Sequence, residues 1–598
     1  MILDNIAKPS DIKNLTIEQL ESLCIELRNE IIRIVSKNGG HLGSNLGSVE
    51  LIIAAHYVFD IEFDKFIFDV GHQAYTHKLI SGRRDLMENL RSKYGAAGFP
   101  DPCESKYDHF IAGHASTSMS AALGIAKARD LNNENYKVIS LLGDGSLSGG
   151  MIYEAMNNAA GTKNFIVILN DNQMSISESV GSMRKYLSKL LASRGGLSFR
   201  KAFSKFLSLF PKNLARKLES FIKNTISAVK GSNIFEEFGF QYIGPIDGHD
   251  LKELIKIFRN VRDVANYKPV IIHTVTQKGR GYSVAEHDAT KLHGVDKSKK
   301  NKYTDVFEKT ILKLAEQDNK IVCITAAMKT GTGLLEFSEK FPNRFFDVGI
   351  AEGHAVTFAA GLAMQGFKPF VCIYSTFLQR AIDQIYHDVA LQNLPVRFII
   401  DKAGFPGSDG KTHAGLYDIS ILQNFQNFTI MSPSSKTELE KMIEFAVQSN
   451  IGPLAIRFPK AEAIGAAVNY EFLQQSRIII EGQKTLIVSI GNLLEIVWDA
   501  IEISKTNPTV IDARFSNPFD FETFYKYAPN HEKIVFIEEG VFGGTSNMIL
   551  EKLFADKQYE IIRKVKFLNA EKSFVNHFSR EDQLQNSQLS SLNLARLL

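Results

Sequence analysis

The sequence of 598 residues contains little of what several classes of protein require. Its four cysteines lie far apart without a C-x-x-C pair, which excludes a disulfide scaffold and favours a reducing compartment; they are Cys24, Cys103, Cys323 and Cys372. No apolar run approaches the roughly 18 residues of a membrane-spanning helix, and the first residues lack the apolar core of a secretory signal. A formal charge of +3 gives no reason to expect nucleic acid or a membrane surface as a partner. We therefore expect a cytoplasmic protein with neither partner.

The composition is that of a globular protein, with 44% hydrophobic and 23% charged residues, and the length exceeds what one hydrophobic core fills. Short apolar runs alternate with helical patterns along the chain, which predicts doubly wound parallel sheets. We expect three α/β domains, over about residues 1–305, 306–478 and 479–598. Strands are predicted at 66–70, 138–142, 165–170 and 270–276, then at 321–325, 345–348, 369–373, 396–401 and 428–431, and finally at 485–490, 509–512 and 533–538.

Residues 183–235 interrupt the first of these domains with a basic, amphipathic stretch. Between Arg200 and Lys230 there are eight basic residues against the single acid Glu219. Phenylalanines 203, 206 and 210 recur there at helical spacing. The stretch is conceivable as a membrane-surface or partner-binding segment, but an insertion that packs on its own domain is favoured.

The most informative stretch runs from Val138 to Met174. It contains two apolar runs of the kind found in buried parallel strands. Asp144 follows the first run and Asn172 follows the second, 28 positions later (172 − 144). Carboxylate and amide oxygens suit Mg²⁺ held against a diphosphate, and glycines beside Asp144 let the backbone approach phosphates closely. This spacing of G-D-G and N-D-N resembles the thiamine diphosphate fingerprint.

Thiamine diphosphate chemistry also needs a buried carboxyl group that hydrogen-bonds N1′ of the aminopyrimidine. The sequence offers Glu352, which follows a predicted strand and stands at a predicted helix start among small and apolar residues. A first-turn glutamate that complements the helix dipole is the alternative reading. We predict that Glu352 is the N1′ partner.

The whole chain resembles the 1-deoxy-D-xylulose-5-phosphate synthases, which are transketolase-like enzymes. The resemblance rests on motifs in one order along nearly the full length: G-G-H-L-G-S-N-L-G-S-V-E (39–50), F-D-V-G-H-Q-A-Y-T-H-K (68–78), G-H-A-S-T-S (113–118), G-D-G-S (143–146), I-L-N-D-N-Q-M-S-I-S-E (168–178), G-P-I-D-G-H-D (244–250), Q-K-G-R-G-Y (277–282), A-E-G-H-A-V-T-F-A-A-G (351–361), Y-S-T-F-L-Q-R (374–380), S-D-G-K-T-H-A-G (408–415) and E-E-G-V-F-G-G (538–544). It implies two thiamine-diphosphate-binding domains, for the diphosphate and the pyrimidine, with the cofactor between them, followed by a transketolase-type C-terminal domain. It also implies a homodimer.

The resemblance assigns cofactor and metal positions. The magnesium ligands it implies are Asp144, Asn172 and the backbone carbonyl of Met174. The cofactor contacts it implies are His72, Gly113, His114, Ala115, Gly145, Ser146, Tyr282, Glu352 and Phe377, the last as a flat wall beside the pyrimidine. Family positions for proton transfer are His41, His72, His293 and His413, and the sequence does not say which histidine serves which step.

The reaction so implied joins pyruvate to D-glyceraldehyde 3-phosphate with loss of CO₂, and its product, 1-deoxy-D-xylulose 5-phosphate, feeds isoprenoid, thiamine and pyridoxal biosynthesis. The acceptor contacts implied are Tyr374, Arg380, Lys402, Asp409 and Arg457. Two positions depart from the family pattern. Lys402 stands where arginine is frequent, which keeps the charge but loses the planar fork. Gly353 stands where glutamine is commoner, and the missing side chain could widen the site.

Transketolase is the nearest alternative, because it shares the domain order and the cofactor apparatus but takes a ketose phosphate in place of pyruvate. A 2-oxo-acid dehydrogenase subunit is a weaker alternative. A binding protein that has lost the chemistry is disfavoured, because Asp144, Asn172 and Glu352 are all present.

Overall fold

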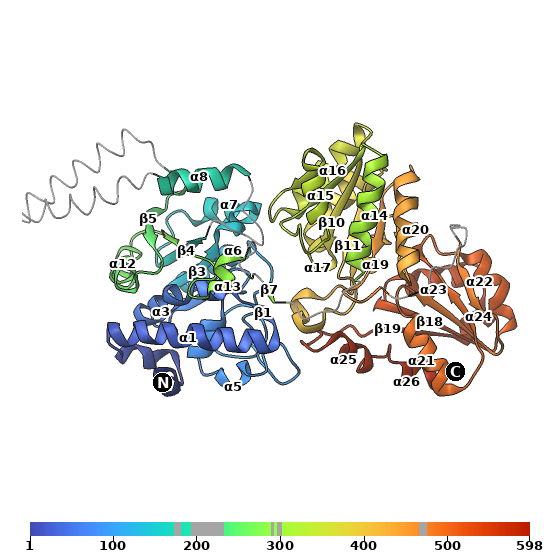
Figure 1. Cartoon of the computed structure of the whole chain (residues 1–598), viewed down its shortest axis with the longest axis horizontal. Helices are drawn as coiled ribbons and strands as arrows, with labels where there is room; N and C mark the ends of the chain where they lie inside the picture. Colours follow the sequence, from blue (N-terminus) through green and yellow to red (C-terminus); the bar gives the residue numbers. More distant parts are fainter. Residues whose placement is uncertain are drawn as a thin grey trace, which may run out of the picture. The chain divides into compact units, whose positions relative to one another are not determined.

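A computed structural model describes residues 1–172, 181–192, 233–288, 292, 294–295, 302–463, 465 and 475–598 (Figure 1). The chain forms two compact units, each of which is described by itself: residues 1–90 with 95–296, and residues 91–94 with 297–598. The predicted site residues Met174 and His293, and most of the basic stretch 183–235, lie outside the described residues. In the part that is described, no helix is both long and apolar enough to cross a membrane.

The first unit is built on a five-stranded sheet in which every neighbouring pair is parallel. Its order is β2 (Lys65–Phe68), β3 (Val138–Gly143), β4 (Phe165–Asp171), β6 (Val270–Val275) and β5 (Gln241–Asp247). The apolar runs predicted β2, β3, β4 and β6 to within two residues. They did not predict β5, because its sequence Q-Y-I-G-P-I-D is mostly half-exposed and is interrupted by a Gly-Pro pair.

Helices cover both faces of this sheet, and for this reason its strands read as unbroken apolar runs. One face packs against α1 (Ile17–Asn38), α3 (Val49–Val58) and α12 (Leu251–Val264). The other packs against α6 (Ser118–Leu131) and α7 (Gly150–Ala159).

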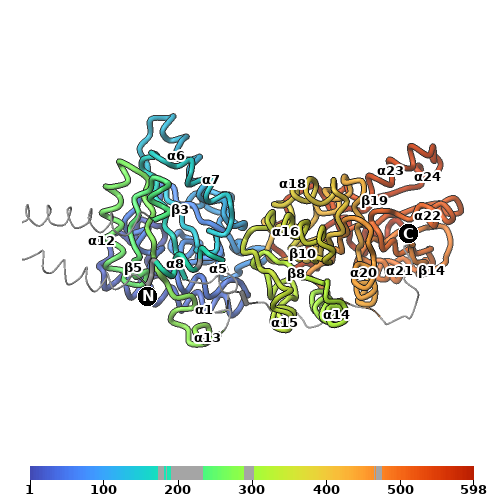
Figure 2. The backbone as a smooth tube through the Cα atoms, turned by 90° about the horizontal axis from the view of Figure 1, so that it is seen from above, coloured from blue at the N-terminus to red at the C-terminus, as the bar shows by residue number. Residues whose placement is uncertain are grey.

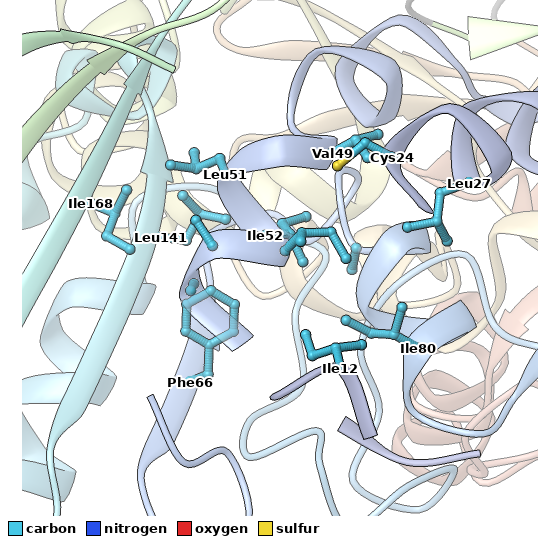
Figure 3. Packing of buried hydrophobic residues seen from close by; sticks show 14 of the residues in the cluster. Ile12, Cys24, Leu27, Val49, Leu51, Ile52, Phe66, Ile80, Leu141 and Ile168 are labelled. Atoms are coloured by element: carbon cyan, nitrogen blue, oxygen red, sulfur yellow. The ribbon is translucent and has the colours of Figure 1, made fainter. Parts of the chain in front are cut away.

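Alternate residues of one strand therefore enter different cores. Leu141 of β3 and Ile168 of β4 belong to the cluster formed with α1 and α3. Figure 3 shows their side chains next to each other and facing Leu51 of α3. Leu142 and Leu169, one position further along each strand, belong to the opposite cluster. The sheet is thereby held rigidly at the edge where its strands end.

The second unit contains a seven-stranded sheet. Its order is β17 (Phe515–Asn517), β12 (Thr429–Met431), β13 (Leu454–Arg457), β11 (Arg397–Asp401), β10 (Lys368–Tyr374), β8 (Ile321–Thr325) and β9 (Phe345–Asp347). All pairs are parallel except that between β12 and β17. Helices α14 (Tyr303–Gln317) and α20 (Lys436–Gln448) cover one face, and α16 (Glu352–Met364) covers the other.

Residues 477–598, here called the C-terminal region, add a second sheet to the same unit. Its order is β14 (Arg477–Ile480), β16 (Thr509–Asp512), β15 (Thr485–Ile490), β18 (Lys533–Val541) and β19 (Val565–Ala570), with only β14 antiparallel. The covering helices are α21 (Leu494–Ser504) and α26 (Ser591–Ala595) on one face, and α22 (Phe521–Tyr527), α23 (Thr545–Ala555) and α24 (Tyr559–Lys564) on the other. Helices α23 and α24 both contact β18, and they lie beside each other in Figure 2.

Short elements complete the chain. They are β1 (Gly40–His41), α2 (Gly43–Gly47), α4 (Tyr75–Ile80), α5 (Arg84–Met87), α8 (Gly181–Ala192), α11 (Ile234–Glu237), α13 (Ser283–His287), β7 (Gly294–Val295), α15 (Leu335–Lys340), α17 (Ser375–Leu378), α18 (Ile382–Gln384), α19 (Asp418–Leu422) and α25 (Arg580–Gln585). The structure thus has three α/β sheets, while the three domain boundaries expected from sequence remain predictions.

Candidate active site

The two predicted metal ligands of the first unit follow neighbouring parallel strands. In the register of β3 and β4, Gly143 is the partner of Asn170. Asp144 comes directly after β3 and is buried, and Asn172 comes directly after β4. Both therefore stand at the same edge of the sheet, where the carboxyl ends of parallel strands place ligand groups.

Asp69 ties two of the predicted cofactor loops together. This buried carboxylate follows β2 and accepts hydrogen bonds from the backbone N–H of Ser116 at 2.8 Å and of Ser118 at 3.0 Å. It also accepts the hydroxyl of Ser146 at 2.5 Å, and the Ser116 hydroxyl donates to the Ser146 carbonyl at 2.9 Å. The loop that carries Gly113 is thus fixed to the turn that begins at Asp144.

His41 and His72 lie edge to face, with ring centroids 5.7 Å apart. The side-chain amide of the buried Asn45 holds both backbones, because it donates to the carbonyl of His41 at 2.9 Å and to that of His72 at 2.7 Å. Burial, with a smaller contribution from Lys278, lowers the pKa of His72 to about 3. His72 is therefore neutral at physiological pH. The residues next to His293 lie beside His41, since Gly294 pairs with His41 between β7 and β1.

A second buried network supports the end of β4. Asp171 lies 3.0 Å from Nε2 of His273, and Nδ1 of His273 lies 2.8 Å from the hydroxyl of Tyr242. Because an ionised carboxylate only accepts, His273 donates from Nε2 and accepts the tyrosine proton at Nδ1. This network holds the backbone immediately before Asn172.

The edge of the sheet that carries Asp144 and Asn172 also contains a buried lysine. Lys278 is 3% exposed, and burial lowers the pKa of its ammonium group to about 8, against the opposing attraction of Asp144. An ammonium group in this setting is stabilised by a phosphate anion. A Cβ placed on Gly143 would meet nothing within 4 Å, and Gly113 has a φ of 146°. One carboxylate, one amide oxygen, an ammonium group and open space beside glycine fit magnesium and a diphosphate.

The remaining predicted contacts of this unit lie on the same loops. His114 and the buried Ala115 follow Gly113, and Gly145 lies in the turn after β3. Tyr282 stands directly before α13, in the segment that follows Lys278.

In the second unit, Glu352 is the first residue of α16 and is 3% exposed. Burial raises the pKa of its carboxyl group, and Arg380 opposes that rise from 3.7 Å, the distance between Nη1 and Oε2. A buried carboxyl group with a raised pKa can share a proton with a ring nitrogen. The buried carboxyl group of Glu352 therefore fits the predicted role as the partner of N1′.

Gly353 does not leave an open space. A Cβ at this position would lie 3.0 Å from Oε1 of Gln384, so the Gln384 side chain already occupies the volume next to Glu352. The Gln384 side chain therefore limits the widening of the site that the sequence suggests at Gly353.

Four predicted residues form one aromatic and cationic cluster. The rings of Tyr374 and Phe377 stack with centroids 5.9 Å apart, and Phe377 meets His413 edge-on at 5.5 Å. The ammonium group of Lys402 lies 3.5 Å from the centroid of the Tyr374 ring, in cation–π contact. The Thr412 hydroxyl lies 2.9 Å from Nδ1 of His413.

Asp409 and Arg457 are both held by ions of opposite charge. Asp409 forms an ion pair with Arg91, whose Nε also donates to the Ser408 carbonyl at 3.3 Å. Burial disfavours the charge of Asp409, but Arg91 and the smaller contributions of His413, Lys460 and Lys402 together outweigh it and hold the pKa of that carboxyl group well below its usual range. Arg457 is buried, with Nε 2.9 Å from Asp418. The acceptor-contact roles of Arg457, paired with Asp418, and of Arg380, beside Glu352, remain predictions.

Three family models match the chain in order and together span most of it. The one described as 1-deoxy-D-xylulose-5-phosphate synthase matches residues 3–276. The pyrimidine-binding domain of transketolase matches residues 299–464, and the C-terminal domain of transketolase matches residues 474–593. The chain belongs to the 1-deoxy-D-xylulose-5-phosphate synthase family.

Solved transketolases are similar to this member of the synthase family over long stretches of chain. A Campylobacter jejuni transketolase is 19% identical, with 97% of this chain and 99% of that chain covered and a TM-score of 0.42. A Pichia stipitis transketolase complex with sedoheptulose 7-phosphate is 13% identical, with 96% of each chain covered and a TM-score of 0.43. A split-gene transketolase, described as an inactive β4 tetramer, is 23% identical over 50% of this chain and 96% of that chain, with a TM-score of 0.44. At these TM-scores we base no argument on the likenesses.

Several supporting residues of this synthase-family chain were not predicted from sequence. Asn45, Asp69, Asp171 and Lys278 lie inside motifs that were recognised, but each acts on a residue far away along the chain. These residues are, in the same order, His72, Ser116, His273 and Asp144. His273 lies in a strand, where the sequence V-I-I-H-T-V gave no signal beyond two polar residues in a buried run.

Proposed function

We infer that the chain catalyses the thiamine-diphosphate-dependent condensation of pyruvate with D-glyceraldehyde 3-phosphate, which yields 1-deoxy-D-xylulose 5-phosphate and CO₂. The family match over residues 3–276 supports this transferase reaction over that of transketolase. The structural observation that carries the chemistry is the buried carboxyl group of Glu352 at the start of α16.

The cofactor, when bound, supplies a nucleophilic C2 carbon and an electron sink for decarboxylation. Asp144 and Asn172, with the carbonyl of Met174, would hold Mg²⁺, and Lys278 would neutralise phosphate charge. Glu352 would share a proton with N1′ of the aminopyrimidine, and Phe377 would lie against its ring. The buried side chains of Asp144, Lys278 and Glu352 support this assignment.

Two alkoxide groups form and collapse in the reaction, so protons must reach and leave substrate oxygens. We assign these transfers to His41, His72 and His413, and to His293. Because His72 has a pKa of about 3, it donates from a neutral ring rather than as an imidazolium ion. The hydrogen bonds from Asn45 to the backbone carbonyls of His41 and His72 support a shared role for this pair.

The phosphorylated aldehyde is assigned to the cluster around Tyr374. Lys402 offers a positive charge to the phosphate, and Asp409, held ionised by Arg91, is suited to a substrate hydroxyl. A lysine ammonium group is a point charge without the fork of arginine, so Lys402 would bind phosphate with less directional preference.

Further parts of the proposal rest on the family alone. We propose magnesium as the metal, a homodimer as the working form, the cytoplasm as the location, and roles in isoprenoid, thiamine and pyridoxal biosynthesis. The four cysteines, none of which is disulfide-bonded in the structure, support a reducing compartment.

The test is CO₂ release from pyruvate in the presence of Mg²⁺ and thiamine diphosphate, measured with and without D-glyceraldehyde 3-phosphate. We expect release to rise steeply with the aldehyde and to accompany a five-carbon sugar phosphate. No reaction with pyruvate, together with turnover of xylulose 5-phosphate and an aldose phosphate, would move the chain to the transketolases.

A further inference from the structure

Residues 404–415, here called the acceptor loop, are closed at their base by two backbone hydrogen bonds. The N–H of Gly404 donates to the carbonyl of Gly415 at 2.6 Å, and the N–H of Gly415 donates back at 2.9 Å. The loop carries Asp409 and His413, both assigned above to the site. Its interior conformation is not that of a regular helix, since Gly407 and Gly410 have positive φ values of 64° and 67°.

The contacts that fix this loop come from the C-terminal region. Gln583 of α25 binds Gly407 at two points, accepting its N–H at 2.8 Å and donating to its carbonyl at 3.0 Å. The same amide donates to the carbonyl of Asn576 at 2.7 Å, so its orientation is set. Gln583 is 4% exposed, and a buried amide with all three bonds made holds its partners firmly.

Glu539 of β18 makes the second attachment. Its Oε1 accepts the N–H of Phe405 at 2.8 Å, while its other oxygen pairs with Arg580 of α25. A Cβ on Gly404 would lie 2.3 Å from Oε1 of Glu539, so glycine is required for this approach. Gln583 of α25 and Glu539 of β18 therefore hold the first half of the loop directly, and Arg580 of α25 acts on it through Glu539.

Apolar anchors complete the attachment. Phe405 at the start of the loop and Leu416 just after it are buried in the same core as Ile537 of β18 and Val497 of α21. Gly410 lies against His577, whose backbone nitrogen would be 3.2 Å from a Cβ at that position. The loop is thus packed on the C-terminal region at its beginning, middle and end.

We propose that Gln583 and Glu539 are positioning residues that set the affinity for the phosphorylated acceptor by fixing the loop that carries Asp409 and His413. Neither side chain has been placed against cofactor or substrate, so they act through the loop. The inference rests on the proposed function, and it gives the C-terminal region a defined part in acceptor binding. A side chain that is held within tenths of an ångström binds its ligand at a lower entropic cost than one on a mobile loop.

The test compares Gln583→Leu and Gln583→Glu with Gln585→Leu, an exposed residue of the same helix. For Gln583→Leu we expect the KM for D-glyceraldehyde 3-phosphate to rise about 10-fold or more, while the KM for pyruvate and the affinity for thiamine diphosphate stay within about twofold. Gln583→Glu keeps the acceptor for the Gly407 N–H but loses the donor, so we expect an intermediate rise. Gln585→Leu should behave as the parent enzyme.

The single tryptophan of the chain, Trp498 on α21, reports the integrity of the C-terminal region in every variant. An unchanged acceptor KM in both Gln583 variants would overturn the proposal, as would an equal loss in all kinetic parameters with an early fluorescence transition. If Gln583→Leu does not fold, Gln583→Glu alone decides between these outcomes. Absence of product from the parent enzyme would instead refute the proposed function, so the two failures are distinguishable.

Discussion

Nη1 of Arg380 lies 3.7 Å from Oε2 of the buried Glu352. The sequence motif had suggested that this arginine holds the acceptor phosphate, but the structure places its charge beside the carboxyl group assigned to N1′. The positive charge opposes the rise in the pKa of Glu352 that burial causes. Arg380 is therefore in a position to tune the ionisation of Glu352.

Replacement of Arg380 by methionine tests this relationship. Without the guanidinium group the pKa of Glu352 should rise further, because burial is then opposed only by a backbone hydrogen bond. We expect the acidic limb of the profile of kcat/KM for pyruvate against pH to move to higher pH. A large rise in the KM for the aldehyde with an unmoved pH profile would instead support direct phosphate binding by Arg380.

Glu352→Gln should lower kcat by about 10³-fold, since an amide cannot share a proton with N1′ as a carboxyl group does. CO₂ release is the measurement, with thiamine diphosphate binding followed by calorimetry. The matched control is Glu316→Gln, at a surface ion pair with Lys340, which should leave turnover unchanged. Turnover near that of the parent enzyme in Glu352→Gln would contradict the assignment.

Asp69→Asn should weaken thiamine diphosphate binding in the presence of Mg²⁺ by about 10- to 100-fold, as is common for residues that orient ligand loops. The amide would turn an N–H donor toward the donors of Ser116 or Ser118, so the loop and the turn would separate. Isothermal titration calorimetry measures the effect. Asp85→Asn, at an exposed position of α5, is the control, and equal affinities in the two variants would contradict the role given to Asp69.

Glu538 should make the C-terminal region less stable as the pH rises. Burial raises the pKa of its carboxyl group from 4.5 to about 7, against the opposing effect of Arg457. Between these values the folded state binds more protons than the unfolded state, so the free energy of unfolding falls as the pH rises and the loss is complete above about 7.

Glu538→Gln should remove this loss and raise the free energy of unfolding at pH 8 by up to about 3 kcal/mol, with a much smaller effect at pH 5. Urea unfolding followed by Trp498 fluorescence measures it. Glu551→Gln, an exposed residue of α23, should show no such dependence on pH. The same pH dependence in parent and Glu538→Gln would show that another group is responsible.

Much of the fold was predictable, because strands covered on both faces leave long apolar runs in the sequence. Thr485–Ile490 and Thr509–Asp512 were predicted to the residue. The edge strands β5, β14, β17 and β19 were not predicted, since an edge strand is only partly covered and its residues need not be apolar. The central strand β13 was also missed, because it is a run of only four residues that ends in a charged arginine.

The site was predictable where a motif is local and not where residues act across the fold. Glu352 was recognised because the strand, the turn and the helix start adjoin in sequence. The contact of Gln583 with Gly407 joins residues 176 positions apart, and no pattern within either segment indicates it. The pairing of Arg457 with Asp418 was missed for the same reason.

The register between β3 and β4 has a consequence for how relatives of this protein are found. Asp144 and Asn172 are neighbours because their strands are neighbours. The helix and turns between the strands therefore determine only how many residues separate the two ligands along the chain. Residues could be inserted in the turn between α7 and β4, around Gly161, without moving either side chain relative to the other. A search that fixes the number of residues between the two ligands would therefore overlook proteins with the same arrangement in space.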